Sequence, residues 1–190
     1  MPTADQRQST APGRRLQRTV VLVGLMGAGK SSVGHRLAAS LGVPFRDSDA
    51  EVEAAANQTI AEIFEEHGEA YFRDGERRVI ARLIDRAPAV VASGGGAFMN
   101  DETRRLILQR AIAVWLRADL ETLVARTAGR SHRPLLNGPD PRGVLARLID
   151  ERYPVYAEAH IAVDTMPGQT HEAMVARIVQ SLESRAGAFG

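Results

Sequence analysis

The segment from Gly24 to Ser31 has the residue types and spacing that bind nucleotide phosphates: Gly-Leu-Met-Gly-Ala-Gly-Lys-Ser. Its glycines let consecutive backbone N–H groups curve around phosphate oxygens, and a helix starting here adds the positive end of its dipole. Lys30 would reach the β- and γ-phosphates, and the hydroxyl of Ser31 would bind Mg²⁺. Lys30 is the only lysine of the chain, which otherwise uses arginine for its permanent positive charges. The motif predicts a site for a Mg²⁺-bound nucleotide, formed by Gly27, Ala28, Gly29, Lys30, Ser31 and Ser32.

Two carboxylates, Asp47 and Asp49, stand at the end of a short expected strand over residues 44–47. Because side chains alternate along a strand, both point the same way if the extended backbone continues to Asp49. One carboxylate could then hold the Mg²⁺ shell, and the other could orient or deprotonate an acceptor hydroxyl. The alternative is a solvated turn in which Asp49 caps the next helix. The neighbouring phosphate motif favours the first interpretation.

Residues that could bind an anionic substrate follow. Arg73 comes directly after Phe72 and three residues before Glu76 on an expected helix. At this spacing the Arg–Glu pair is either a surface ion pair of small value or a guanidinium braced to meet a substrate carboxylate. Gly94–Gly96 directly follows a buried strand, where glycines offer backbone N–H groups and let a ligand approach closely.

Segment 128–140 contains Gly, Pro, Asn and two arginines without any hydrophobic periodicity, so we expect a mobile loop. An arginine on a closing lid, such as Arg133, can neutralise the charge of a phosphoryl group during transfer and help to exclude water. The alternative is that Arg133 is an ordinary solvated loop residue.

Short apolar runs that alternate with helical periods must position these residues. Strands are expected at 19–23, 44–47, 89–92, 111–116 and near 161–163. Helices are expected at 32–41, through much of 49–86, at 101–110, about 119–127, 141 to about 153 and 170 to about 184. Thr59 and Glu62 have the spacing of a capping box. This alternation predicts an α/β fold whose parallel sheet is covered on both faces, with ligands at the carboxyl ends of its strands.

Length and composition exclude several classes of protein. The 190 residues suit one domain, and the formal net charge of +1 gives no general attraction to nucleic acid or membranes. The absence of cysteine excludes disulfides and thiolate metal sites. No apolar run approaches the roughly 20 residues that span a bilayer. The polar, arginine-containing residues 1–17 have no apolar secretory region, so a disordered tail is expected.

Together these residues resemble the shikimate kinase family of P-loop kinases, over nearly the whole chain from residue 18 to residue 184. The resemblance implies a three-layer α/β/α fold with a five-stranded parallel sheet. It also implies a single kinase domain over 18–190, with a helical substrate-binding segment at about 49–86 and a mobile lid at about 128–140. The segments that carry the resemblance are Gly24–Ser31, Phe45–Asp49, Ile63–Phe64, Gly68–Glu69, Phe72–Glu76, Gly94–Gly96, Arg133–Leu136 and Arg152–Tyr156.

The family's activity is ATP-dependent phosphorylation of the 3-hydroxyl of shikimate, on the route to chorismate and the aromatic amino acids. By resemblance, the protein is a cytoplasmic monomer that uses ATP and Mg²⁺ and has no membrane or nucleic-acid partner. The resemblance gives each site residue a role: Ser31 and Asp47 at Mg²⁺; Asp49 at the substrate hydroxyl, where it could act as base; Arg73 and Arg152 at the shikimate carboxylate; Gly94, Gly95 and Gly96 against the substrate; Phe64 and Phe72 lining its pocket; Lys30 and the lid residue Arg133 at the phosphates; and Arg126 at adenine.

Two alternatives stay open at this point. One is another small-molecule kinase of the same fold, acting on gluconate or a nucleoside monophosphate. Arg73 and Asp49 favour a hydroxylated acid over a nucleotide, which would need base recognition. The other is a non-catalytic module that senses shikimate or a nucleotide. Such a module is expected to have lost Lys30, Asp49 or the lid arginine, and all three are present.

Overall fold

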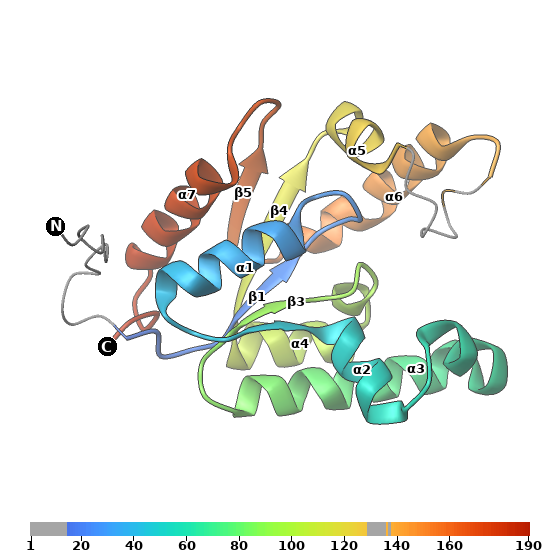
Figure 1. Ribbon diagram of the computed structural model, residues 1–190, viewed down its shortest axis with the longest axis horizontal. Coiled ribbons are helices and arrows are strands. Elements are labelled where there is room, and N and C mark those ends of the chain that lie inside the picture. Colours follow the sequence, from blue (N-terminus) through green and yellow to red (C-terminus); the bar gives the residue numbers. More distant parts are fainter. Residues whose placement is uncertain (1–14, 129–135, 137) are drawn as a thin grey trace, which may run out of the picture.

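The sheet is formed by five parallel strands in the order β2-β3-β1-β4-β5 (Figure 1). The computed structural model describes residues 15–128, 136 and 138–190. The strands are β1 (Val20–Val23), β2 (Phe45–Asp47), β3 (Val90–Ala92), β4 (Ile112–Ala118) and β5 (Ile161–Thr165). β1, β3 and the first five residues of β4 are buried, as expected of strands that have helices on both faces.

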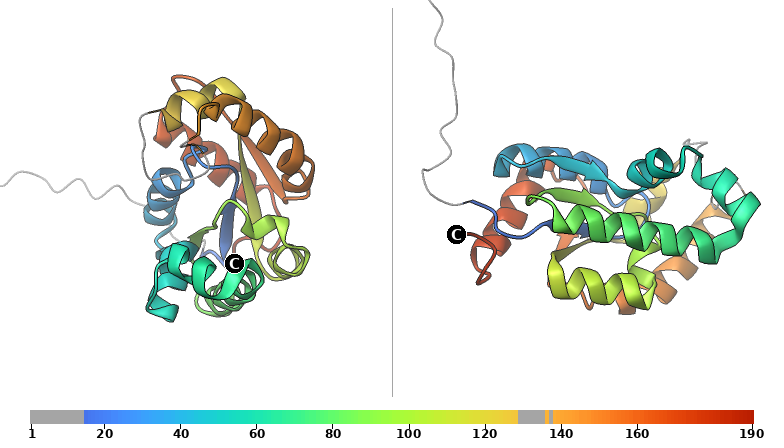
Figure 2. Two further views of the ribbon diagram at one scale, coloured as in Figure 1. Left: turned by 90° about the vertical axis from the view of Figure 1, so that its right-hand side faces the viewer. Right: turned by 90° about the horizontal axis from the view of Figure 1, so that it is seen from below.

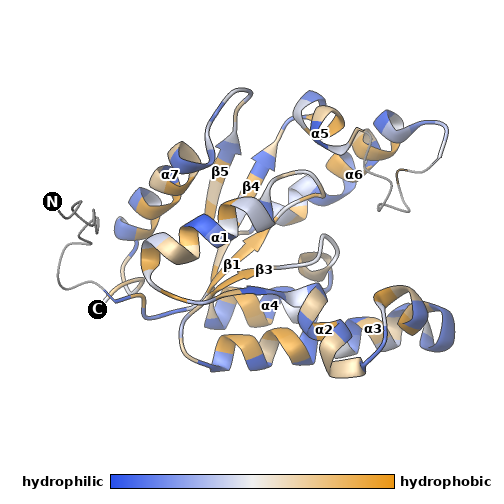
Figure 3. Cartoon of the chain, in the orientation of Figure 1, coloured by the Kyte–Doolittle hydropathy of each residue, from blue (hydrophilic) through white to orange (hydrophobic). Residues whose placement is uncertain are grey.

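Helices cover both faces of this sheet. In the described residues they are α1 (Lys30–Leu41), α2 (Ser48–Ala56), α3 (Ile60–Asp85), η1 (Ala97–Met99), α4 (Asp101–Arg110), α5 (Leu120–Thr127), α6 (Pro141–Tyr156) and α7 (His171–Glu183). α1 and α7 lie together on one face, and α4 and α6 lie on the other (Figures 1 and 2). Apolar residues concentrate on the strands and on the helix faces turned toward them (Figure 3). The predicted three-layer fold and five-stranded parallel sheet are confirmed.

α2 and α3 form the helical segment that was predicted over 49–86. In Figure 1 α2 and the first part of α3 project beyond the sheet, and the rest of α3 runs back alongside α4. The capping box at the start of α3 is present, since Thr59 and Glu62 each accept a hydrogen bond from the other's backbone N–H. Gly68 interrupts α3 with φ of 80° and ψ of 177°, a conformation that glycine adopts readily. The break divides a short first helix from the longer one that carries Arg73.

α6 is longer than the sequence predicted. The helix was expected to end at about Tyr153, and Pro154, the next residue, removes a helical hydrogen bond. The helix continues through Pro154 to Tyr156, whose side chain is fully buried. Tertiary contacts of Tyr156 therefore outweigh the local cost of proline, and this extra turn proves important for the site.

The two ends of the described chain pair with each other at the amino-terminal edge of the sheet. Leu16 is buried and forms an antiparallel bridge with Phe189, while Arg15 and Gly190 exchange two backbone hydrogen bonds. The predicted tail over 1–17 is thus wrong at its carboxyl end, because residues 15–17 belong to the folded unit. None of the helices in the described part of the chain is long and apolar enough to cross a membrane.

Candidate active site

The predicted site residues gather at the carboxyl ends of β1, β2 and β3. The loop Gly24–Gly29 follows β1, Asp47 is the last residue of β2, and Gly94 lies two residues beyond β3. Because parallel strands end at the same edge of a sheet, these segments meet at one place.

The phosphate loop is shaped by left-handed glycines and opens onto a helix terminus. Gly27 and Gly29 have φ of 83° and 97°, which only glycine adopts cheaply. Gly29 is the N-cap of α1 and offers no side-chain cap, so the first N–H groups of the helix face the loop without a protein side chain on them. This arrangement suits an anion such as a phosphate.

Lys30 and Arg126 place their positive charges on this loop. Lys30 Nζ donates to the carbonyl oxygens of Gly24 at 2.7 Å and Leu25 at 3.0 Å. Arg126, half-buried on α5, donates Nη1 to the carbonyls of Gly27 and Ala28 at 3.4 and 3.3 Å. Two cations, 96 positions apart in the sequence, therefore contact this loop. Ser31 and Ser32 are exposed in the first turn of α1.

Asp47 and Asp49 meet as expected, but not by strand alternation. β2 ends at Asp47 and α2 begins at Ser48, so the extended backbone does not reach Asp49. Asp47, not Asp49, is the helix cap: its Oδ1 accepts the N–H groups of Asp49 at 2.9 Å and Ala50 at 3.3 Å. The extended backbone expected at Asp49 and the alternative of an Asp49 cap are both wrong, because Asp47 is at once the last residue of β2 and the N-cap of α2.

Asp49 is half-buried and lies near the carboxylate of Asp47 and the cations of Lys30 and Arg73. Burial raises the pKa of this carboxyl, the charge of Asp47 raises it further, and Lys30 and Arg73 partly oppose the rise. Asp49 Oδ1 lies 2.6 Å from where a Cβ on Gly94 would stand, so glycine is required for this approach. The result is a carboxylate held against the loop after β3 with a raised proton affinity.

The residues predicted for Mg²⁺ suit that ion. Oδ1 of Asp47 caps α2, and within the described residues its Oδ2 has no hydrogen bond. Ser31 is exposed at the phosphate loop. No group of three or more His, Cys, Asp or Glu side chains that could hold a metal occurs in the described part of the chain. A hydroxyl and one carboxylate are the sparse set that Mg²⁺ uses when phosphates and water supply the remaining ligands.

Arg73 is held by a buried partner, so the surface-pair alternative is wrong. Glu76 is 1% exposed and accepts from Arg73 Nη1 at 2.7 Å. Burial raises the pKa of Glu76, and the hydrogen bond and charge of Arg73 oppose the rise. Arg73 Nη2 lies 2.3 Å from where a Cβ on Gly96 would stand, so the guanidinium rests directly on this glycine.

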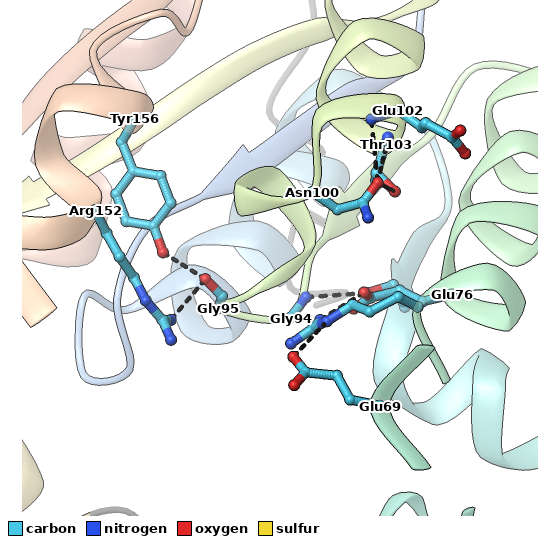
Figure 4. A network of polar contacts seen from close by, with 11 residues as sticks. Glu69, Glu76, Gly94, Gly95, Asn100, Glu102, Thr103, Arg152 and Tyr156 are labelled. Carbon is cyan, nitrogen blue, oxygen red and sulfur yellow. Dashed lines mark hydrogen bonds and ion pairs between the residues drawn. The ribbon is translucent and has the colours of Figure 1, made fainter. Parts of the chain in front are cut away.

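The loop after β3 binds protein groups as well as leaving room for a ligand. The N–H of Gly94 donates to Ser48 Oγ at 3.1 Å, so the expectation that it is offered to a ligand is contradicted. The carbonyl of Gly95 accepts from Arg152 Nη1 at 2.9 Å and from the Tyr156 hydroxyl, as Figure 4 shows. The roles of Ser48 and Tyr156 were not predicted, although Tyr156 stands one helical turn after Arg152.

The two predicted aromatic residues differ in exposure. The ring centroids of Phe64 and Phe72 are 4.7 Å apart, but Phe72 is 4% exposed and Phe64 is 37% exposed. Phe72 also carries the Arg73 guanidinium 5.1 Å from its ring centroid. Phe72 therefore supports Arg73 from the core, whereas Phe64 lies at the surface. Arg133 lies outside the described residues, so the lid remains a prediction.

Known proteins resemble this chain over most of its length. The family model for shikimate kinase matches residues 26–183. The shikimate kinase of Paramagnetospirillum magneticum is 55% identical over 181 residues, which cover 94% of this chain and 92% of the relative. This chain belongs to the shikimate kinase family. A relative from Caulobacter vibrioides, also named shikimate kinase, is 62% identical over 148 residues, covering 78% of this chain and 74% of its own length.

Solved structures agree with the family. A shikimate kinase from Acinetobacter baumannii in complex with shikimate has a TM-score of 0.81 at 39% identity, covering 88% of this chain and 93% of that one. A gluconokinase from Sinorhizobium meliloti reaches a TM-score of 0.56 at 21% identity, covering 91% and 99%. The likeness to the gluconokinase shows the fold alone.

Proposed function

We propose that this enzyme phosphorylates the 3-hydroxyl of shikimate with ATP, producing shikimate 3-phosphate and ADP on the route to chorismate. The observation that carries the proposal is the pairing of Arg73 with Arg152. Both line one cavity of about 830 Å³, together with Gly96. Arg152 Nη1 also lies 3.4 Å from where a Cβ on Gly95 would stand, and Arg73 rests on Gly96. Two guanidiniums on adjacent glycines suit a carboxylate, while Asp49 nearby suits a hydroxyl.

Each residue contributes a step that phosphoryl transfer requires. The backbone N–H groups of the phosphate loop and Lys30 hold the phosphates, and the arginine pair orients the acid. Asp49 accepts the proton of the attacking hydroxyl or orients that hydroxyl. Mg²⁺, held by Ser31 and Asp47, would neutralise charge on the phosphate oxygens.

The roles of the remaining predicted residues belong to the same proposal. Arg126 would form one side of the adenine site, since it already lies over the phosphate loop. Gly95 and Gly96 would contact shikimate through the backbone, and Phe64 and Phe72 would border its pocket. Arg133 would close over the phosphates from the lid. We also propose that the enzyme acts as a monomer in the cytoplasm.

The test is release of ADP from Mg-ATP with shikimate, gluconate and AMP supplied in parallel. A strong signal that depends on shikimate, together with a new phosphate ester at the 3-position in the ³¹P and ¹H NMR spectra, is expected. Turnover with gluconate or AMP alone would retain the kinase fold and overturn the substrate. Shikimate binding without turnover on any acceptor would instead support the sensing module.

A further inference from the structure

The carbonyl of Gly95, to which Arg152 donates, accepts a second hydrogen bond from the hydroxyl of Tyr156. Arg152 and Tyr156 are four residues apart on α6, so both project from the same face of the helix. This register exists only because α6 continues through Pro154. In Figure 4 the two side chains approach the Gly95 carbonyl from one side, and each donates a hydrogen bond to it.

The hydroxyl of Tyr156 is not needed for packing. Its ring is fully buried, with the rings of Trp115, Phe98 and Tyr153 at centroid distances of 6.0, 6.3 and 6.3 Å. Burying a hydroxyl among such rings costs free energy unless it finds a partner, and phenylalanine would fill the same space. Burial raises the pKa of the phenol, so Tyr156 stays protonated and donates.

The acceptor is the middle residue of three consecutive glycines, the most flexible backbone that a chain can have. Gly94 meets Asp49 and Gly96 meets Arg73, so rotation at Gly95 would move both contacts. A carbonyl oxygen has two lone pairs, and here Arg152 and Tyr156 occupy them together. The second donor removes the freedom that Arg152 alone would leave.

We propose that Tyr156 is a positioning residue: by fixing the Gly95 carbonyl it sets the spacing of Arg73 and Arg152 and so the affinity for the substrate carboxylate. The inference rests on the proposed function, because it assigns that carboxylate to the two arginines. Tyr156 itself touches no substrate in this scheme.

The chain supplies a matched control on the same helix. Tyr153 is half-buried against Trp115, with ring centroids 4.9 Å apart, and its hydroxyl, like that of Tyr156, donates to a backbone carbonyl, here that of Ala118. Ala118 ends β4, which β1 separates from β3 and the glycine loop that follows it. Tyr153→Phe and Tyr156→Phe therefore each remove a hydroxyl that donates to a backbone carbonyl, and only the Tyr156 hydroxyl shares its carbonyl with Arg152.

The experiment measures KM for shikimate, KM for ATP, kcat and thermal unfolding for both variants. Tyr156→Phe is expected to raise the shikimate KM about tenfold and to leave the ATP KM within about twofold, the size expected when one buried hydrogen bond is lost. Tyr153→Phe should leave both KM values within about twofold, although it removes a comparable bond. In the Arg152→Ala variant, the further substitution Tyr156→Phe should raise the shikimate KM by less than about twofold, because the two residues act as a unit.

Several outcomes overturn the inference: an unchanged shikimate KM in Tyr156→Phe, an equal rise in Tyr153→Phe, a parallel rise in the ATP KM, or full additivity with Arg152→Ala. If Tyr156→Phe does not fold, Tyr156→Met fills the core without a donor and must show the same selective rise. The wild-type enzyme separates the two proposals. If the wild-type enzyme does not phosphorylate shikimate, the proposed function and this inference are both overturned. If the wild-type enzyme does so and Tyr156→Phe has an unchanged shikimate KM, only the inference is overturned.

Discussion

At the scale of single residues, burial decides which charges matter. α3 carries two ion pairs at the same three-residue spacing. Glu76 is 1% exposed beside Arg73, whereas the Asp74 side chain is 46% exposed beside Arg77. Exposed pairs contribute little because solvent screens them. The sequence could identify both pairs but not their difference, since burial depends on how α3 packs against the glycine loop after β3.

Glu76→Gln tests whether the buried partner holds the substrate arginine. Losing a charge-assisted hydrogen bond to Arg73 should raise the shikimate KM by about 10- to 100-fold and leave the ATP KM unchanged. Asp74→Asn is the control on the same helix and should change either value less than about twofold. Steady-state kinetics at saturating co-substrate measures both. A similar effect of the two substitutions would remove the special role of Glu76.

Asp49→Asn should separate activity from stability. Losing the base is expected to lower kcat by roughly 10²–10⁴-fold, with ATP binding by calorimetry almost unchanged. Burial and Asp47 raise the folded-state pKa of Asp49, so the ionised carboxylate opposes folding at neutral pH. A neutral amide removes that cost, and the variant should unfold at a higher temperature. Retained turnover would exclude Asp49 from the mechanism.

The same shift fixes the sign of the pH dependence. Because the active form of Asp49 is ionised, kcat/KM should fall as pH decreases through a pKa above the ordinary 3.8. The stability change has the opposite sign, because a raised pKa favours the protonated form of Asp49 in the folded state. The increase in the free energy of unfolding caused by Asp49→Asn should therefore be largest above that pKa and vanish below pH 3.8. Rate and unfolding profiles over the same pH range check both signs.

At the scale of elements, the sequence predicted nearly every strand and helix, because apolar runs, caps and glycines are local signals. It failed where a distant contact decides the outcome. The backbone turns from strand to helix at Asp47, whose own side chain caps α2. α6 continues through Pro154 to Tyr156, whose hydroxyl donates to the carbonyl of Gly95, a residue 61 positions earlier in the sequence. Helix propensity depends on neighbouring residues in the sequence, so it cannot predict the effect of such a distant partner.

Two glycines of α3 provide a matched test of the break in that helix. A Cβ on either Gly68 or Gly75 would meet no atom within 4 Å, so their backbone conformation is the main difference. Gly75→Ala should stabilise the protein by about 0.5–1 kcal/mol, as alanine does in a helix interior. Gly68→Ala should destabilise it by about 1–3 kcal/mol, because φ of 80° strains any L-residue. Urea unfolding measures both, and equal effects would mean that the break is not fixed by Gly68.

At the scale of the whole molecule, the order of the strands and the pairing of the two chain ends could not be predicted from a single sequence. The alternation of strands and helices implied a parallel sheet, but no local pattern indicates that β1 lies between β3 and β4. The same limit explains the misplaced tail boundary. Leu16 looks like one apolar residue in a polar stretch until Phe189, at the other end of the chain, is placed beside it.

Leu16→Ala should therefore weaken folding without altering catalysis. Leu16 is 5% exposed, and shortening a buried leucine costs about 2–4 kcal/mol, or roughly 5–12 °C in Tm for a domain of this size. Arg15→Ala, on an exposed neighbour that pairs through its backbone, should cost less than about 0.5 kcal/mol. Both KM values should stay unchanged, because Leu16 precedes β1 and the site lies where the strands end. Differential scanning calorimetry with parallel kinetics checks this. A changed shikimate KM would show that the two edges of the sheet are coupled, and an unchanged Tm would show that the paired ends do not stabilise the fold.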